Sequence, residues 1–339
     1  MKKYNIAVIG ATGIVGETVL SLLHERNFPV GTIQAIASER SLGETVMFGH
    51  RTLIVDTIEG CDFSTIDIAF FAAGTEISLQ YAPIAAKAGC TVIDKSTAFR
   101  YEKDIPLVVP EVNADALRNY SERNIIANPN CSTIPLVAAI KPIYDLVGIQ
   151  RINIATYQSV SGAGKEAIGA LAKETVELLS GEPIDEPVLS KQIAFNVLPK
   201  IDAYHENGYT LEEMKLLWET QKILNDDTIL VNATAVRVPV FFGHSAAIHL
   251  ETEKYISAAD VRALLQKAPG IIVVDGDDYP TPITHAANQD GVFVGRIRND
   301  ISHQNGIDLW VVSDNVRKGA ALNAIQIAEL LVQNAFYKH

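Results

Sequence analysis

The stretch YNIAVIGATGIVG, residues 4–16, decides the fold because it joins a short apolar run to a glycine-rich turn. Residues 4–9 are rich in β-branched and apolar side chains, which is typical of a buried strand, and a helical pattern follows Gly13 as far as Leu23. Strand, glycine turn and helix in this order are the context of a dinucleotide-binding fingerprint, here spaced G-x-x-G-x-x-G. Such glycines let a pyrophosphate approach main-chain N–H groups at the start of the helix. The candidate cofactor contacts in this turn are Gly10, Thr12, Gly13, Ile14 and Val15.

The segment after the second predicted strand indicates which dinucleotide is bound. That strand spans residues 32–37 and runs into Ser38, Glu39, Arg40 and Ser41. An acidic residue at this place holds the ribose diol of NAD, whereas arginine and hydroxyl groups hold the 2′-phosphate of NADP. Arg40 between two serines therefore favours NADP, provided that Glu39 points away. The alternative is that Arg40 is only a solvated loop cation.

Strands and helices alternate through the rest of the first 130 residues. We expect strands at 66–72, 91–94 and 125–127, a helix at 78–88 and a β-like piece at 106–111. This alternation predicts a Rossmann-type, doubly wound parallel sheet with its ligand at the carboxyl edge. The loop 95–100 lies at that edge and ends in Arg100, a candidate clamp for phosphate or carboxylate.

Cys131 is the candidate nucleophile. Residues 125–127 read as the end of a buried strand, Asn-Pro-Asn as a tight turn, and residues 132–146 as an apolar-periodic helix. The thiol then lies at or just before a helix N-terminus, where unpaired N–H groups and the helix dipole favour the thiolate. The alternative is an inert buried cysteine, which is the simplest account of Cys90.

From residue 150 the pattern changes to successive strands with fewer intervening helices. We expect strands at 151–160, 229–240, 245–251 and 270–274, a hairpin pair at 291–298 and 306–313, and helices at 165–180, 211–224 and 260–268. The second domain is thus predicted as α+β with a mixed or antiparallel sheet. Residues 1–130 would be the NADP-binding domain and 131–314 the catalytic and dimerisation domain. A helix at 320–336, within the segment 315–339, would return to the nucleotide-binding sheet.

Three segments of the second domain carry polar side chains that are candidates for substrate binding or catalysis. Glu212 and Lys215 are spaced i, i+3 and share one helix face, which by itself is more often a solvated pair than a site. Arg237 lies on the long strand, and His244 follows a glycine at a turn. An imidazole there supplies the base that a thiol nucleophile needs, although a lone histidine is more often structural.

Composition excludes several classes of function. The chain has 339 residues, a net charge of −12 and no run of about 18 apolar residues, so we expect neither a nucleic-acid partner nor a membrane span. Three cysteines cannot all pair within one chain, which favours a reducing, cytoplasmic location. The eight histidines show no metal-ligand spacing, so no metal is expected.

Taken together, the motifs resemble those of the aspartate-β-semialdehyde dehydrogenase family. The resemblance runs from residue 4 to the last helix and is carried by GATGIVG at 10–16, SERS at 38–41, STAFR at 96–100, NPNCST at 128–133, QSVSGAG at 158–164, EEMK at 212–215, VNATAVRVPVFFGHS at 231–245 and DNVRKGAA at 314–321. One departure is Ala235, where the family usually has cysteine. The resemblance implies a reversible reaction of L-aspartate 4-semialdehyde, phosphate and NADP⁺ to L-aspartyl 4-phosphate and NADPH, on the route to lysine, threonine and methionine.

The resemblance also implies a role for each matched residue. Cys131 would add to the aldehyde, His244 would act as the acid/base that takes the thiol proton, and Gln158 would position the substrate. The binding residues that it implies are Arg100 and Lys215 for phosphate, Arg237 for the α-carboxylate, Glu212 for the α-amino group, Asn315 for the nicotinamide carboxamide, and the backbone of residues 12–15 with Ser161 and Gly162 for the cofactor.

Other assignments stay open at this point. N-acetyl-γ-glutamyl-phosphate reductase shares the fold plan and the Cys/His pair, and glyceraldehyde-3-phosphate dehydrogenase is a more distant rival. Glu212 favours a free α-amino group over an N-acetyl group. A non-catalytic NADP-binding homologue is a third possibility. The family also implies a homodimer, with a tetramer as the alternative.

Overall fold

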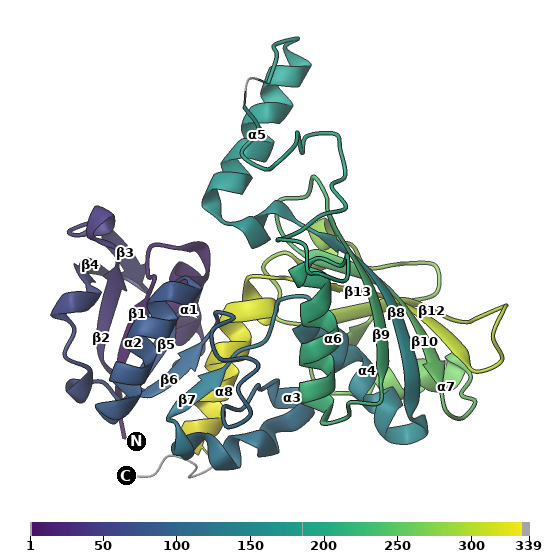
Figure 1. Cartoon of the computed structure of the whole chain (residues 1–339), viewed down its shortest axis with the longest axis horizontal. Helices are drawn as coiled ribbons and strands as arrows, with labels where there is room; N and C mark the ends of the chain where they lie inside the picture. Colours follow the sequence, from purple (N-terminus) through teal and green to yellow (C-terminus); the bar gives the residue numbers. More distant parts are fainter. Residues whose placement is uncertain (1, 185, 334–339) are drawn as a thin grey trace. The chain divides into compact units, whose positions relative to one another are not determined.

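The structure, a computed structural model, describes residues 2–184 and 186–333 and divides into two compact units. The first unit comprises Met1–Pro129 with Ala320–His339, and the second comprises Asn130–Gly319. Figure 1 labels their elements along the chain.

The first unit contains a seven-stranded sheet. Its strands are β1 (Tyr4–Ile9), β2 (Val30–Ala37), β3 (Thr45–Phe48), β4 (Arg51–Thr57), β5 (Ile68–Phe71), β6 (Thr91–Asp94) and β7 (Ile125–Ala127). Their order is β3-β4-β2-β1-β5-β6-β7, and every neighbouring pair is parallel except β3 with β4. The strand order reverses direction at β1, so the glycine turn that follows β1 lies at the topological switch point.

Helices pack on this sheet and close its core. They are α1 (Ile14–Glu25), α2 (Thr75–Lys87), α3 (Pro110–Asn113) and α8 (Leu322–Gln333). The largest core of the unit joins apolar residues of β1 to those of α1 and α8. Asn323 of α8 is fully buried and donates from Nδ2 to the Val108 carbonyl at 2.9 Å and to Asn128 Oδ1 at 2.8 Å. The last helix is therefore fixed to the segments that precede and follow β7.

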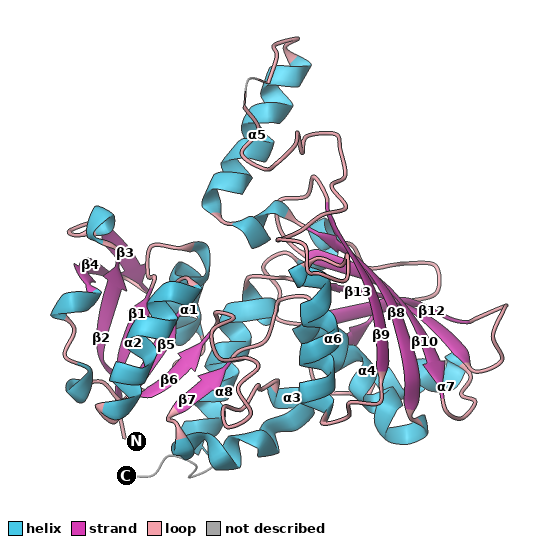
Figure 2. Ribbon diagram, viewed as in Figure 1, coloured by secondary structure: helices cyan, strands magenta, loops and turns pink. Residues whose placement is uncertain are grey.

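The second unit contains a six-stranded mixed sheet. Its strands are β8 (Ile149–Gln158), β9 (Leu230–Arg237), β10 (His244–Thr252), β11 (Ile271–Val273), β12 (Val292–Asn299) and β13 (Gly306–Ser313). The order is β11-β12-β13-β10-β8-β9; the pairs β8–β9 and β11–β12 are parallel and the others antiparallel. Figure 2 shows the long strands of this sheet side by side in magenta. The predicted fold class, a Rossmann-type domain with a second α+β domain, is confirmed.

Helices α4 (Thr133–Val147), α6 (Leu211–Leu224) and α7 (Ala258–Leu265) pack against this sheet, and α4 also packs against α6 and α7. Helix α5 (Lys165–Leu179) instead builds a small apolar cluster with Val160 and residues 189–198. The remaining short helical turns are Glu39–Ser41, Ile58–Gly60, Phe63–Thr65, Ala114–Glu122, Val160–Ala163, Pro282–Ala286 and Arg317–Ala321.

The observed elements differ from the expected ones in several places. The β-like piece at 106–111 is not a strand, because Pro106 and Pro110 cannot donate to a ladder; only Leu107 forms a bridge, and Pro110 begins α3. The hairpin β3–β4 was not predicted. The strand expected to reach residue 240 ends at Arg237, shortly before Pro239.

Another correction concerns His244, which is the first residue of β10 rather than part of a turn. Strands β9 and β10 both pair with β8, on opposite sides, so they are not a hairpin. The predicted last helix begins at Leu322, after the turn Arg317–Ala321, and its expected end at 334–336 lies outside the described residues.

Residues 2–184 and 186–333 include no candidate for a membrane-spanning helix. No helix among them has both the length and the apolar content to cross a bilayer.

Candidate active site

The candidate nucleophile lies where the sequence predicts it. Cys131 comes directly before Ser132, the N-cap of α4, and its side chain is partly exposed. Asn130 Oδ1 accepts the Ser132 N–H at 2.8 Å, so a side chain stands in for a missing helical partner. On the other side, Gly319 leaves no room: a Cβ there would be 3.1 Å from Cβ of Cys131. The backbone of Cys131 is thus closely held from two directions.

A buried carboxyl group on α6 gathers three donors from different segments. Glu212 accepts Gln158 Nε2 at 3.0 Å, Asn130 Nδ2 at 3.0 and 3.2 Å, and Lys215 Nζ at 3.0 Å. Burial alone would raise the pKa of Glu212, but Lys215 and the hydrogen bonds from Gln158 and Asn130 outweigh it, and the pKa is lowered. The side chain is therefore ionised at neutral pH.

Lys215 completes this cluster. Its Nζ also bonds to Asp202 Oδ2 at 2.9 Å. Burial opposes its charge, but the neighbouring Glu212 and Asp202 raise its pKa overall. Lys215 therefore stays protonated, with an i, i+3 partner on its own helix as the spacing suggested.

Arg237 is the last residue of β9 and pairs in register with Gln158, the last residue of β8. Its Nη1 donates to the Ser159 carbonyl at 2.8 Å. Burial lowers its pKa, while the charges of Cys131 and Glu212 raise it, so both groups lie within electrostatic range of the guanidinium. Arginine remains charged despite this shift because its ordinary pKa is so high.

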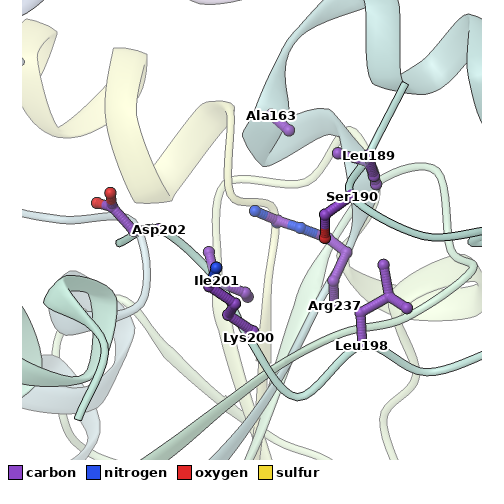
Figure 3. A pocket seen from close by; sticks show the side chains of 8 residues that line it. All are labelled: Ala163, Leu189, Ser190, Leu198, Lys200, Ile201, Asp202 and Arg237. Carbon is purple, nitrogen blue, oxygen red and sulfur yellow. The ribbon is translucent and has the colours of Figure 1, made fainter. Parts of the chain in front are cut away.

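A cavity of about 290 Å³ opens beside Arg237. Figure 3 shows the guanidinium reaching into the middle of the lining residues, which are Ala163, Leu189, Ser190, Leu198, Lys200, Ile201 and Asp202. Two cationic side chains, Arg237 and Lys200, and one acidic side chain, Asp202, therefore line one cavity, with an excess of positive charge. This charge suits an anionic small molecule.

His244 is held through one ring nitrogen. The Ser159 backbone N–H donates to Nδ1 at 3.0 Å, and because an N–H cannot accept, Nδ1 must be unprotonated. Burial and the charge of Arg237 lower the pKa of His244 well below its usual value, so the ring is neutral at neutral pH with its proton on Nε2. Nε2 is buried and has no hydrogen-bond partner among the described residues.

The expected role of His244 as the acid/base that takes the thiol proton stays a prediction. Uptake of the thiol proton at Nε2 requires that nitrogen to be unprotonated, whereas the Ser159 contact places the proton there. In the resting molecule, Nε2 of His244 carries a proton, so the side chain can act as a hydrogen-bond donor or acid at this nitrogen.

Asn315 ties the surrounding turns together. Its Oδ1 accepts from Gly243 N at 3.0 Å and from Ser159 Oγ and Ser161 Oγ at 3.1 Å, and its Nδ2 donates to Ser161 Oγ at 3.0 Å. Asn315 thus joins the end of β8 to the turn that leads into His244. Its expected contact with the nicotinamide stays a prediction.

Gly162 lies against the two principal side chains of the site. A Cβ at this position would be 2.9 Å from Arg237 Nη1 and 3.2 Å from His244 Nε2. The absence of a side chain is therefore what allows both groups to occupy the same small region.

The glycine turn of the first unit fits a dinucleotide pyrophosphate. Gly10 has φ +85°, and a Cβ there would meet the Ala72 carbonyl carbon at 2.9 Å. A Cβ at Gly16 would come within 2.1 Å of the Gly10 carbonyl oxygen, so the helix packs too closely on the turn for any side chain. Gly13 caps α1 without a side-chain hydrogen bond, and the first N–H groups of Ile14 and Val15 face the turn.

The remaining predicted residues of the first unit lie at the carboxyl ends of its strands. Ser38, Arg40 and Ser41 follow β2, with Ser38 and Arg40 exposed, and Thr12 Oγ1 lies 3.5 Å from Ser41 Oγ. Arg100 is buried in the loop after β6, where its Nη2 donates to the Lys95 carbonyl at 2.6 Å.

Sequence reasoning therefore placed Cys131, Gln158, Glu212, Lys215, Arg237, His244, Ser161, Gly162 and Asn315 in one unit, where the structure brings them together in one connected region. It missed Asn130, Ser159, Asp202 and Glu219. The first two adjoin quoted motifs, and Glu219 follows Glu212 by seven residues on the same helix face, which was the available signal. No group of three or more metal-ligating side chains occurs in the described part of the chain.

The comparisons with family models cover both units. Residues 5–120 match the model described as "Semialdehyde dehydrogenase, NAD binding domain", and residues 140–318 match "Semialdehyde dehydrogenase, dimerisation domain". The aspartate-semialdehyde dehydrogenase of Shewanella sp. is 57% identical over 336 residues, 99% of each chain. That of Aquifex aeolicus is 51% identical over 335 residues, 97% of this chain and 98% of the relative.

The similar solved structures come from the same family as the sequence relatives. Aspartate semialdehyde dehydrogenase II of Vibrio cholerae, complexed with ASA, superposes with a TM-score of 0.97 at 56% identity and 98% and 99% coverage. The enzyme from Candida albicans with NADP gives a TM-score of 0.79 at 27% identity, over 99% of this chain and all of that one. The chain belongs to the aspartate-semialdehyde dehydrogenase family.

Proposed function

We propose that this chain catalyses the reversible conversion of L-aspartate 4-semialdehyde, phosphate and NADP⁺ into L-aspartyl 4-phosphate and NADPH through an acyl-thioester on Cys131. The observation that supports it most is the cluster in which Glu212, Gln158 and Lys215 meet beside Arg237, within the unit that carries Cys131. Membership of the family supports the same reaction.

Recognition of the substrate follows from the charges of the cluster. The planar guanidinium of Arg237 is suited to clamp the α-carboxylate with two hydrogen bonds. The ionised carboxyl of Glu212 is suited to the α-ammonium group. An N-acetyl group has no positive charge to offer Glu212, which argues against an N-acetylglutamyl substrate and so against N-acetyl-γ-glutamyl-phosphate reductase.

The reacting groups are Cys131 and His244. The positive charge of Arg237 and the N-terminus of α4 stabilise the thiolate of Cys131, which adds to the aldehyde carbonyl. The Nε2–H of His244 donates a hydrogen bond to the oxygen of the tetrahedral adduct, where negative charge develops. Gln158, anchored on Glu212, fixes the orientation of the substrate.

A phosphate oxygen must then attack the thioester carbonyl, after which the C–S bond breaks and the thiolate of Cys131 leaves, releasing the acyl phosphate. Lys215 and Arg100 are the cations that we assign to this anion, as the family's pattern implies. Arg100 is buried next to Asp94, whose carboxyl accepts from Ser78 and Ser96 and so fixes the loop that carries the arginine. At least two cations are needed near a phosphate dianion that approaches an acyl group.

The first unit holds the cofactor in this proposal. The backbone of residues 12–15 would bind the pyrophosphate, Arg40 with Ser38 and Ser41 would bind the 2′-phosphate, and Ser161, Gly162 and Asn315 would meet the nicotinamide end. Bound NADP⁺ supplies the acceptor for the hydride that leaves the adduct. We assign residues 1–130 and the C-terminal helix to this NADP-binding domain and 131–314 to the catalytic and dimerisation domain.

We also propose that the molecule is a cytoplasmic homodimer built through the sheet of the second unit. One face of that sheet is not covered by α4, α6 or α7 and carries Tyr157, Ala247 and Trp310, with the rings of Tyr157 and Trp310 5.6 Å apart. A cavity of about 480 Å³ lies on this face, lined by Ala247, Trp310 and Pro280 among others. A sheet face with aromatic side chains at its centre and polar ones such as Arg296 and Arg298 beside them suits a second copy of the same surface.

Phosphate-dependent turnover tests the proposed chemistry. NADPH formation from L-aspartate 4-semialdehyde should require added phosphate and should fall at least about 10⁴-fold in Cys131→Ala, because no thioester can form. Absorbance at 340 nm with and without phosphate measures it. Turnover of N-acetylglutamate semialdehyde in place of this aldehyde would move the chain to the rival reductase, and an active Cys131→Ala variant would end the thioester proposal.

Gly162→Ala should damage catalysis without unfolding the protein. The added methyl would push Arg237 and His244 apart, so kcat/KM should fall about 10²-fold. Gly169→Ala is the matched control, since a Cβ there meets nothing within 4 Å, and it should stay within about twofold of the parent. Steady-state kinetics with a thermal melt of each variant measure both effects, and wild-type kinetics in Gly162→Ala would contradict this account.

Ala247→Arg should dissociate the proposed dimer. Ala247 pairs with Trp310 on one side and Ala155 on the other, so an arginine there places a charge in the middle of the sheet face. Sedimentation velocity at micromolar concentration should show a monomer with unchanged far-UV circular dichroism. Ala259→Arg, at an exposed position of α7, should remain a dimer. A dimeric Ala247→Arg protein would show that the interface lies elsewhere.

A further inference from the structure

Helix α6 carries a second buried carboxyl group that none of the proposed roles uses. Glu219 is fully buried, and its Oε2 accepts the backbone N–H of Asn130 at 2.6 Å. Asn130 directly precedes Cys131, and it is separated from Glu219 by 89 residues in the sequence. A short hydrogen bond to a backbone N–H fixes the position of the peptide itself, not only of a side chain.

Asn130 is held at four points, one of which is its carbonyl oxygen, an acceptor for the Ile134 N–H at 3.0 Å. Its N–H donates to Glu219, its Nδ2 donates to Glu212, and its Oδ1 accepts the Ser132 N–H at 2.8 Å. The last bond crosses Cys131 and couples Asn130 to the N-cap of α4. Cys131 lies between these two bonded residues, so we expect a shift of the Asn130 peptide to displace its side chain.

Glu212 and Glu219 are seven residues apart and lie on one face of α6. The first bonds to Gln158 and Lys215, which we assign to the substrate, and the second bonds to the nucleophile segment. One rigid helix thus sets the distance between the substrate groups and the sulfur atom.

We propose that Glu219 is a positioning residue that holds Cys131 in its reactive orientation through the Asn130 peptide. The inference rests on the proposed role of Cys131 as nucleophile. Glu219 does not contact the substrate in this proposal; it acts only through the segment 130–132.

The test compares three substitutions of Glu219. Leucine removes the acceptor, glutamine keeps one oxygen, and aspartate keeps the carboxyl group but shortens its reach. Two rates are measured on the full chain: alkylation of Cys131 by iodoacetamide, assigned by mass spectrometry, and turnover with the semialdehyde. Background alkylation is slow because burial raises the pKa of Cys61 to about 11 and also raises that of Cys90.

We expect Glu219→Leu to lower both the alkylation rate and kcat about 30- to 100-fold, with KM for the semialdehyde within about twofold, because a misplaced nucleophile slows chemistry and not binding. Glu219→Gln should recover activity to within about threefold of wild type. Glu219→Asp should lose about tenfold and serves as the decisive variant if the leucine variant does not fold.

Glu174→Leu is the matched control. Glu174 is a buried carboxyl on α5 that also accepts backbone N–H groups, from Ile193 at 2.8 Å and Ala194 at 3.0 Å, far from Cys131 in sequence. It should lower the melting temperature and leave the alkylation rate of Cys131 within about twofold. If the Glu174 and Glu219 variants lost the same share of the Cys131 alkylation rate and of kcat, the effect would reflect a general loss of stability, and the proposal would be overturned.

A folded Glu219→Leu or Glu219→Asp variant with wild-type alkylation and kcat would also overturn it. The two proposals fail separately. If the wild-type chain did not turn over the semialdehyde, the proposed function would fail, and the alkylation rates would still report whether Glu219 positions Cys131.

Discussion

The ionised, buried carboxyl of Glu212 is the constraint on which the second unit's polar region depends. Donors from Asn130, Gln158 and Lys215 converge on it, and these residues come from a turn, a strand end and a helix. Removing a carboxyl from water costs several kcal/mol unless its hydrogen bonds and a counter-charge compensate, as they do here. Since each donor must be present at once, the three segments can adopt few other arrangements.

Helix α6 transmits this constraint to the rest of the site. Its capping box at Thr210 fixes where the helix begins, and Glu213 closes that box while accepting the Ala235 N–H at 2.9 Å. The strand bearing Arg237 is therefore tied to the same helix turn that presents Glu212. The proposed substrate clamp, Arg237, and the proposed partner of the α-ammonium group, Glu212, are therefore positioned through adjacent residues of a single helix.

Much of the fold was predictable because its signals are local. The strand, glycine turn and helix at residues 4–25 and the helix Leu211–Leu224 follow from periodicity and turn residues within a few positions. The hairpin β3–β4 was missed because apolar residues, Met47 and Ile54, occupy exposed positions of its strands and hide the alternation in the sequence. The contacts of Asn130 with Glu212 and Glu219 span 82 and 89 residues, and the Ser159 bond that sets the His244 tautomer spans 85. Such pairings arise only when the sheet and helices have packed.

The central claim is that Glu212 is stabilised as a charged partner of Lys215, and a double-mutant comparison tests it most directly. Lys215→Met should lower the free energy of unfolding of the second unit by about 3 kcal/mol, because it leaves a buried charge uncompensated. Adding Glu212→Gln should restore at least about half of that loss. Both tryptophans lie in this unit, so urea unfolding followed by their fluorescence measures it. If instead the two substitutions were additive, with the double variant less stable than Lys215→Met alone, Glu212 would not be the organising charge.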